Sequence, residues 1–261
     1  HYCSRRQRQM CIRDSVSLPP ILILALMTKT LLQKYSAKNQ RLMIIRILAE
    51  IGTTVTFLTA LKHMPLANVT AILQSLPLAI TMAAAIFLGE PVGWRRWSAI
   101  CVGFTGVLII IRPGLAGFNS YSLLALAAVI LLTVREISTR QLDNKIPTVT
   151  VALSTTLGIT AFAALMLIGT EWADINFASW SLIIAAAAAV TVATLLSVVA
   201  MRTGDIGFVS PFRYTSLIGA IGLGILLFGE WPDGITLLGA AIIAFAGIYS
   251  LYREQIFNKN V

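Results

Sequence analysis

Residues 60–91 read ALKHMPLANVTAILQSLPLAITMAAAIFLGEP, and this stretch decides the fold class. Between Pro65 and Gly89 almost every residue is apolar, without the polar–apolar alternation of a half-buried strand. A helix needs about 20 apolar residues to cross a bilayer, and residues 66–88 supply that length. The stretch therefore predicts a membrane-spanning helix that ends at helix-breaking residues on both sides.

The composition extends this interpretation to the whole chain. Of the 261 residues, 57% are hydrophobic and 12% are charged, with a mean hydropathy of +0.83. A soluble domain carries about 25% charged residues. A chain with so few charges cannot cover a surface that faces water, so its main partner is the lipid bilayer. The net charge of +9 then predicts basic cytoplasmic loops and no nucleic-acid partner.

Similar apolar stretches recur along the chain and predict an all-α polytopic membrane protein with eight full spans. The predicted spans are 42–63, 65–88, 93–112, 119–140, 146–169, 177–201, 206–228 and 233–252. A ninth stretch near 18–33 is short and begins at Pro19-Pro20. The connections are tight, and no hydrophilic domain is inserted between the spans.

The basic residues predict the orientation of the spans. If the loop at 34–46 is cytoplasmic, the outside segments collect only Lys62 and Arg112. The inside segments collect Lys34, Lys38, Arg41, Arg46, Arg95, Arg96, Arg140, Lys145, Arg202, Arg253 and Lys259. This asymmetry obeys the positive-inside rule, and all five tryptophans fall at loops or helix ends, where an interfacial belt would place them. We therefore expect a cytoplasmic C-terminus.

The sequence also resembles itself after a shift of 140 positions. Residues 60–91 then align without a gap on residues 200–231, and the Gly89-Glu90 pair falls on Gly229-Glu230. Chance likeness between two Leu/Ala-rich segments is the alternative, but the matching Gly-Glu turns favour a duplication. The predicted topology gives the two copies opposite orientations, and inverted repeats of this kind are typical of secondary transporters.

The opening residues 1–15, HYCSRRQRQMCIRDS, do not fit the repeat. Shifted back by 140, the second helix of the second copy covers about residues 6–29, so three arginines would replace apolar positions. A charge at mid-membrane costs about 2.5–3.5 kcal/mol even on the most lenient scale. MCIRDS also resembles translated adapter sequence, so we expect residues 1–15 to be foreign to the fold. A basic arm that binds anionic lipid is the alternative.

Three segments resemble the drug/metabolite transporter superfamily, EamA type. They are residues 60–114, residues 209–254 and VREISTRQL at 134–142, and the Gly-Glu turns with PFRYTS at 211–216 are the most specific features. The resemblance implies ten helices in a bacterial inner membrane, both ends cytoplasmic, and a central cavity open alternately to each side. It implies a permease for a small organic metabolite, with no cofactor and no enzymatic reaction.

On that plan the chain divides into two five-helix repeats. Residues 16–114 are the first repeat, without its first helix and part of its second, and residues 119–254 are the second. Residues 255–261 form a cytoplasmic tail. The oligomeric state stays open, with a homodimer among the alternatives.

Charged residues inside the spans are candidates for function, because a charge in the membrane is costly. Glu50 lies about 12 Å into its helix, where it is either the i,i+4 partner of Arg46 or a proton-exchanging group that couples transport to a gradient. Glu136 shares a helix face with Arg140 and is expected to pair with it. Arg135 points about 100° away from Glu136 and has no such partner on its own helix, so it either snorkels to the interface or faces the cavity.

Arg213 is the main candidate for binding substrate. It lies about seven residues into its predicted span, and no acid occurs within four positions on either side. A guanidinium at that depth needs an anionic partner or water, and a substrate carboxylate or phosphate would supply bidentate geometry. A structural pair with Glu50 or another helix is the alternative. The preferred substrate is therefore anionic or zwitterionic.

The repeat adds further site candidates at matching depths. The shift of 140 places Gln74 on Tyr214 and Ser75 on Thr215. These four residues either line a cavity at the repeat interface or form hydrogen bonds between helices.

Prolines, acids and glycines near these positions have structural explanations. Pro77 and Pro211 either open their helices and expose carbonyls or are tolerated by bundle packing. Glu90, Glu230 and Asp233 precede helices and are expected to cap them. The small residues Gly103, Gly106, Gly219, Gly222 and Gly224 indicate close helix packing.

Other classes of protein are less compatible with the sequence. The only histidines are His1 and His63, and the three cysteines show no metal-ligand spacing, which leaves few residues for a metal site or a catalytic triad. A membrane-embedded transferase would need clustered Asp, His or Glu. A non-transporting subunit or receptor is the other alternative, and the inverted repeat argues against it because such symmetry serves two-sided access.

Overall fold

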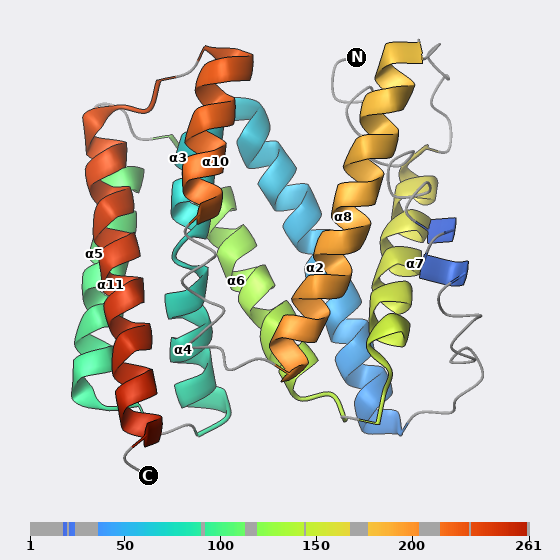
Figure 1. Ribbon diagram of the computed structural model, residues 1–261, viewed down its shortest axis with the longest axis horizontal. Helices are drawn as coiled ribbons and strands as arrows, with labels where there is room; N and C mark the ends of the chain where they lie inside the picture. Colours follow the sequence, from blue (N-terminus) through green and yellow to red (C-terminus); the bar gives the residue numbers. More distant parts are fainter. Residues whose placement is uncertain are drawn as a thin grey trace. The chain divides into compact units, whose positions relative to one another are not determined.

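The structure is a computed structural model that describes residues 18–19, 21–23, 36–89, 92–112, 119–143, 145–167, 177–203, 215–229 and 231–259. Every regular element in these ranges is helical (Figure 1), which confirms the all-α fold class. The elements are α2 (Ala37–His63), α3 (Leu66–Leu73), α4 (Leu76–Phe87), α5 (Trp94–Ile111), α6 (Tyr121–Arg140), α7 (Thr148–Leu167), α8 (Phe177–Thr203), α10 (Thr215–Leu223), the π-helix η1 (Gly224–Phe228) and α11 (Gly234–Lys259).

Five of the described helical segments are long and apolar enough to cross a membrane. They are Ala37–His63, Leu66–Phe87, Trp94–Ile111, Tyr121–Arg140 and Thr148–Leu165, and they match the first five predicted spans. The other three predicted spans contain the shorter apolar stretches Ile183–Leu196, Ser216–Leu226 and Gly234–Ser250. The prediction of a polytopic membrane protein is therefore confirmed.

The start of α2 differs from the prediction. This helix begins at Ala37, five residues before the predicted span 42–63, so it includes part of the predicted cytoplasmic segment 34–46. Lys38 to Arg41 continue the helix because a helix needs backbone hydrogen bonds and not apolar side chains, so it extends beyond its apolar part. Arg46 consequently lies inside the helix, and only 3% of its surface is exposed.

The helices form two compact units, each of which takes segments from both halves of the chain. The first unit contains residues 1–51 and 138–203, and the second contains residues 52–137 and 204–261. The predicted foreign segment 1–15 and most of the ninth predicted span lie outside the described residues. Within that span, Ile21 is buried and packs against Ala152 and Leu153 of α7.

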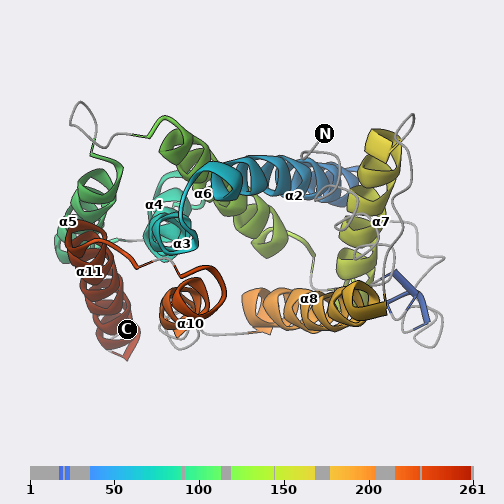
Figure 2. The same cartoon turned by 90° about the horizontal axis from the view of Figure 1, so that it is seen from above.

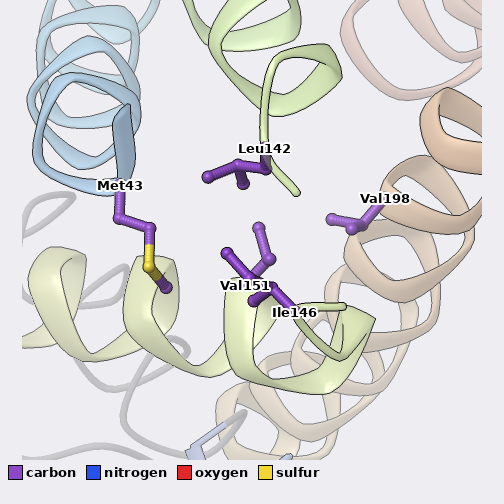
Figure 3. Packing of buried hydrophobic residues seen from close by; sticks show 5 residues of the cluster. All are labelled: Met43, Leu142, Ile146, Val151 and Val198. Atoms are coloured by element: carbon purple, nitrogen blue, oxygen red, sulfur yellow. The ribbon is translucent and has the colours of Figure 1, made fainter. Parts of the chain in front are cut away.

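The core of the first unit lies where α2, α7 and α8 meet the connection after α6. Figure 3 shows Met43, Leu142, Ile146, Val151 and Val198 pointing toward one another. All five are at most 9% exposed. In a membrane such a core holds helices together by close packing rather than by escape from water.

The second unit is built on the antiparallel pair α5 and α11, which lie side by side in Figures 1 and 2. A Cβ atom added to Gly106 of α5 would lie 2.8 Å from the carbonyl oxygen of Gly239 in α11, so glycine at both positions lets the backbones touch. At Gly103 an added Cβ would overlap Leu78 of α4. The predicted packing role of Gly103 and Gly106 is confirmed.

The same prediction stays open for two glycines of α10. A Cβ added to Gly219 or Gly222 would meet no atom within 4 Å in the described part of the chain.

The two predicted Gly-Glu turns have the same backbone conformation where it is described. Gly89 follows α4 with a φ of +67°, and Gly229 follows η1 with a φ of +65°. Glycine adopts this left-handed conformation without a steric cost, which explains its use at both helix ends. This likeness supports the predicted duplication. The two copies differ just before the turn, because only the second ends in a π-helix.

Candidate functional site

The candidate site is centred on a break in the most buried of the five spans. Within Leu66–Phe87, 72% of the residues in the apolar window are buried, against 17–44% in the other four. The span is interrupted at Gln74 and Ser75, between α3 and α4. Pro77 explains the break, since it has no N–H to donate to the carbonyl of Leu73. Gln74 and Ser75 keep a right-handed helical backbone and their N–H groups still donate to carbonyls of the preceding turn, so the interruption is local and neither alternative for Pro77 is decided.

The break is surrounded by other helices of its unit. α3 contacts α5, α10 and α11, and α4 contacts α5 and α11, as seen from above in Figure 2. Irregular backbone at membrane depth is tolerated where protein or a water-filled cavity covers it.

Gln74 links this break to α10. Its side chain is only 4% exposed, and its Nε2 atom donates a hydrogen bond of 3.1 Å to the hydroxyl of Ser216. Ser216 directly follows Thr215, the first residue of α10. Ser216 was not among the residues predicted from the sequence, although a polar residue beside Thr215 in an otherwise apolar helix could have indicated it.

Of the residues predicted to line the site with Gln74, the structure describes the side chain of Ser75 but not those of Arg213, Tyr214 and Thr215. Ser75 is fully buried, and its hydroxyl donates to the carbonyl of Ile72 at 2.7 Å, so it serves the helix break itself. Thr215 begins α10, but its side chain is outside what the structure describes. Arg213 and Tyr214 also lie outside the described residues, and their roles stay predictions.

Arg135 and Glu136 of α6 form an ion pair that the sequence analysis did not expect. The Nη2 atom of Arg135 lies 2.5 Å from Oε1 of Glu136, and the two side chains are 17% and 2% exposed. The prediction that Arg135 has no acid partner on its own helix is therefore wrong. Neighbouring residues leave the helix about 100° apart, but the long arginine side chain can curve back, and charges attract strongly away from water.

Arg46 ties three helices of the first unit together. Its Nε atom donates to the hydroxyl of Thr155 in α7 at 3.1 Å, and its Nη1 atom donates to Thr139 in α6. The sequence analysis treated Arg46 only as a partner for Glu50. Glu50 is half-buried on α2 and belongs to this first unit, whereas Gln74 and Arg135 belong to the second.

Asp233 has the predicted capping role at the start of α11. Its Oδ1 atom accepts a 3.0 Å hydrogen bond from the backbone N–H of Thr236, and its Oδ2 atom pairs with Arg112 at the end of α5. Burial raises the pKa of Asp233, but the hydrogen bonds from Thr236 and Arg112 outweigh burial and lower it below its usual value. Glu90 and Glu230 lie outside the described residues.

No group of three or more His, Cys, Asp or Glu side chains suited to a metal ion occurs in the described part of the chain. The helix break offers an amide and a hydroxyl for hydrogen bonding, and α6 carries an ion pair. Such groups can orient a polar molecule without chemically changing it.

The chain matches the model of a known protein family and is similar in sequence to several bacterial transporters. A model of the EamA-like transporter family matches residues 10–112 and 119–253. The chain is 31% identical over 200 residues to a riboflavin transporter of Vibrio cholerae, a match that covers 76% of this chain and 67% of the relative. It is 26% identical over 191 residues to an S-adenosylmethionine uptake transporter of Rickettsia bellii, covering 73% and 65%.

One solved crystal structure shares the fold. It matches with a TM-score of 0.68 at 20% sequence identity, covering 93% of this chain and 85% of that one. At this level of identity the match speaks for the arrangement of helices and not for a substrate.

Proposed function

This chain belongs to the EamA-like transporter family of small-molecule permeases, and we propose that it works by alternating access around the helix break at Gln74. The break is the observation that carries this proposal. Discontinuous helices mark the substrate sites of many secondary transporters, because the interrupted backbone frees polar groups near mid-membrane. We place the protein in a bacterial inner membrane with its C-terminus in the cytoplasm.

The hydrogen bond between Gln74 and Ser216 supports a site at the interface of the predicted repeats. Under the shift of 140, Ser75 and Thr215 are equivalent positions, and Gln74 and Ser216 lie one residue to either side of them. The two copies therefore touch at nearly the same point of each sequence. An inverted repeat places its substrate site at such a point, so that both sides of the membrane can reach it.

For the substrate we propose an anionic or zwitterionic organic metabolite. The relatives named for riboflavin and S-adenosylmethionine indicate the size class. Gln74 and Ser216 can donate to and accept from neutral polar groups, and Arg213, with Tyr214, would hold a carboxylate or phosphate. Arg135 completes the proposed set within the second unit, and the proton-coupling role of Glu50 stays a prediction from the sequence.

Uptake by purified protein in lipid vesicles tests the proposal, with radiolabelled riboflavin and S-adenosylmethionine as first probes. Gln74→Ala and Arg213→Ala should each reduce uptake at least about fivefold, since each removes a hydrogen-bonding group worth about 1–3 kcal/mol. Ser75→Ala is the matched control, because among the described residues its hydroxyl donates only to the carbonyl of Ile72 in the preceding turn. Equal uptake by all three variants and the parent would refute the proposed site.

A further inference from the structure

The start of α5 carries an exposed cationic and aromatic patch that the transport site does not use. Its sequence is Trp94-Arg95-Arg96-Trp97. Trp94 is 74% exposed and Trp97 is 38% exposed, and Arg95 is exposed as well. The guanidinium carbon of Arg95 lies 5.4 Å from the centre of the Trp94 ring, within the range of a cation–π contact.

The length of α5 places this patch at the surface of the bilayer. The helix has 18 residues, or about 27 Å at 1.5 Å per residue, and the hydrocarbon core is about 30 Å thick. The first turn of α5 therefore lies at the level of the lipid headgroups. Exposed tryptophans at this depth are typical of interfacial anchoring.

The charged residues in the first turn of α5 are all basic. α5 has no acidic residue in its first turn, and its N-cap is Gly93, which provides no side-chain cap. Arg96, the next residue, is buried at 9% exposure, so the exposed cation of this turn is Arg95.

The start of α11 offers a built-in comparison. It is the equivalent position under the shift of 140, where Asp233 replaces Gly93 and Ile235 replaces Arg95. Trp231 there is 79% exposed, similar to Trp94. The two helix starts thus share an exposed indole but differ in charge, because Asp233 supplies a carboxylate.

We propose that Trp94, Arg95 and Trp97 bind the phosphate headgroup of an anionic phospholipid. A guanidinium stacked on an indole keeps its N–H edge free to hold a phosphate through two hydrogen bonds. The indoles fix the lipid glycerol region at the correct depth. A zwitterionic headgroup carries its own cation and gains less from Arg95. This inference does not depend on the proposed transport mechanism.

Quenching of tryptophan fluorescence by lipids with brominated chains tests the proposal. One background, W172F/W180F/W231F, reports from Trp94 and Trp97, and a second, W94F/W97F/W172F/W180F, reports from Trp231. In the first background, brominated phosphatidylglycerol should bind about five-fold more tightly than brominated phosphatidylcholine, given about 1 kcal/mol per basic residue near the surface. In the second background the two lipids should quench equally.

Two variants separate a specific site from general surface charge. Arg95→Gln should abolish the preference for phosphatidylglycerol in the first background. Arg41→Gln removes another exposed arginine, on α2, which has no flanking tryptophan, and should leave the preference unchanged. Helix content by circular dichroism confirms that each variant is folded.

The dependence on salt concentration provides a test that needs no substitution at Arg95 or Arg41. The Debye length falls from about 10 Å at 0.1 M to about 3 Å at 1 M salt, so the preference of the parent background should shrink over that range. An unchanged preference in Arg95→Gln, an equal loss in Arg41→Gln, or a similar preference at Trp231 would each overturn the proposal.

Discussion

Replacing Gly106 by alanine should force α5 and α11 apart. A Cβ atom at this position would lie 2.8 Å from the carbonyl oxygen of Gly239 and 2.9 Å from Cγ1 of Ile243. Both distances are shorter than real Cβ contacts. The oxygen belongs to the backbone and cannot rotate away, so the helices themselves must move.

The expected cost follows from two opposing effects. Overpacking a core costs about 1–3 kcal/mol, whereas alanine is about 1 kcal/mol better than glycine within a helix. Gly106→Ala should therefore lower the free energy of unfolding by up to about 2 kcal/mol. Gly219→Ala is the matched control, because no described atom lies within 4 Å of its added Cβ. It should be neutral or stabilising by up to about 1 kcal/mol.

Gly103→Ala should fall between these two variants. The atom that its Cβ would overlap is the far end of the Leu78 side chain, which can change rotamer. Titration with SDS in mild detergent, followed by tryptophan fluorescence, measures all three free energies. The reasoning would be refuted if Gly106→Ala were as stable as Gly219→Ala, since the helices would then not be held at backbone contact.

Three other predictions concern charged side chains. Asp233→Asn should lower stability at pH 7 by less than about 1 kcal/mol, as for an exposed ion pair. The pKa of Asp233 is lowered in the folded state, so its contribution to stability is present above about pH 4 and is lost as the pH falls below that value. The melting temperatures of parent and variant should therefore converge at low pH. A difference in melting temperature that stays constant with pH would contradict the role given to Asp233. Glu136→Gln should cost about 1–3 kcal/mol, because it leaves the part-buried Arg135 charge beside a neutral amide. Adding Arg135→Gln should restore part of the loss, and additive losses in this double-mutant cycle would argue against coupling. Arg46→Met should cost about 1–3 kcal/mol, because the hydroxyls of Thr139 and Thr155 lose a shared donor, and an unchanged SDS midpoint would show that these contacts contribute nothing.

The sequence predicted the helices well because the membrane imposes one simple rule. Each span needs about 20 apolar residues, and the runs that meet this rule appear as helices α2 to α7. The rule applies only to the membrane-crossing part, so it placed the start of α2 five residues too late.

Pairwise contacts were harder to predict from the sequence. Gly103 and Gly219 look alike in the sequence, yet only Gly103 meets another helix in the described structure. Periodicity identifies which side of a helix is small or polar, but tertiary packing decides what lies opposite. For the same reason, the i,i+4 rule predicted Arg140 as the partner of Glu136. In the structure the flexible side chain of Arg135, the residue before Glu136, forms an ion pair with Glu136.

The candidate site was predicted in part. Gln74 was found because the repeat aligned it with another polar residue, and its contact with Ser216 lies next to that alignment. Ser216 was missed since it falls opposite Leu76 in the repeat, where the comparison of the two copies gives no polar match.

Accessibility of position 74 from the two sides of the membrane tests the central claim most directly. The variant Gln74→Cys is made in a background where Cys3, Cys11 and Cys101 are replaced by serine. It is then treated with a membrane-impermeant maleimide, once in right-side-out vesicles and once in inside-out vesicles. Alternating access predicts labelling from both sides, with Ser75→Cys labelled far more slowly because that side chain is fully buried. Labelling from one side only, or from neither, would contradict a site that opens in turn to each face of the membrane.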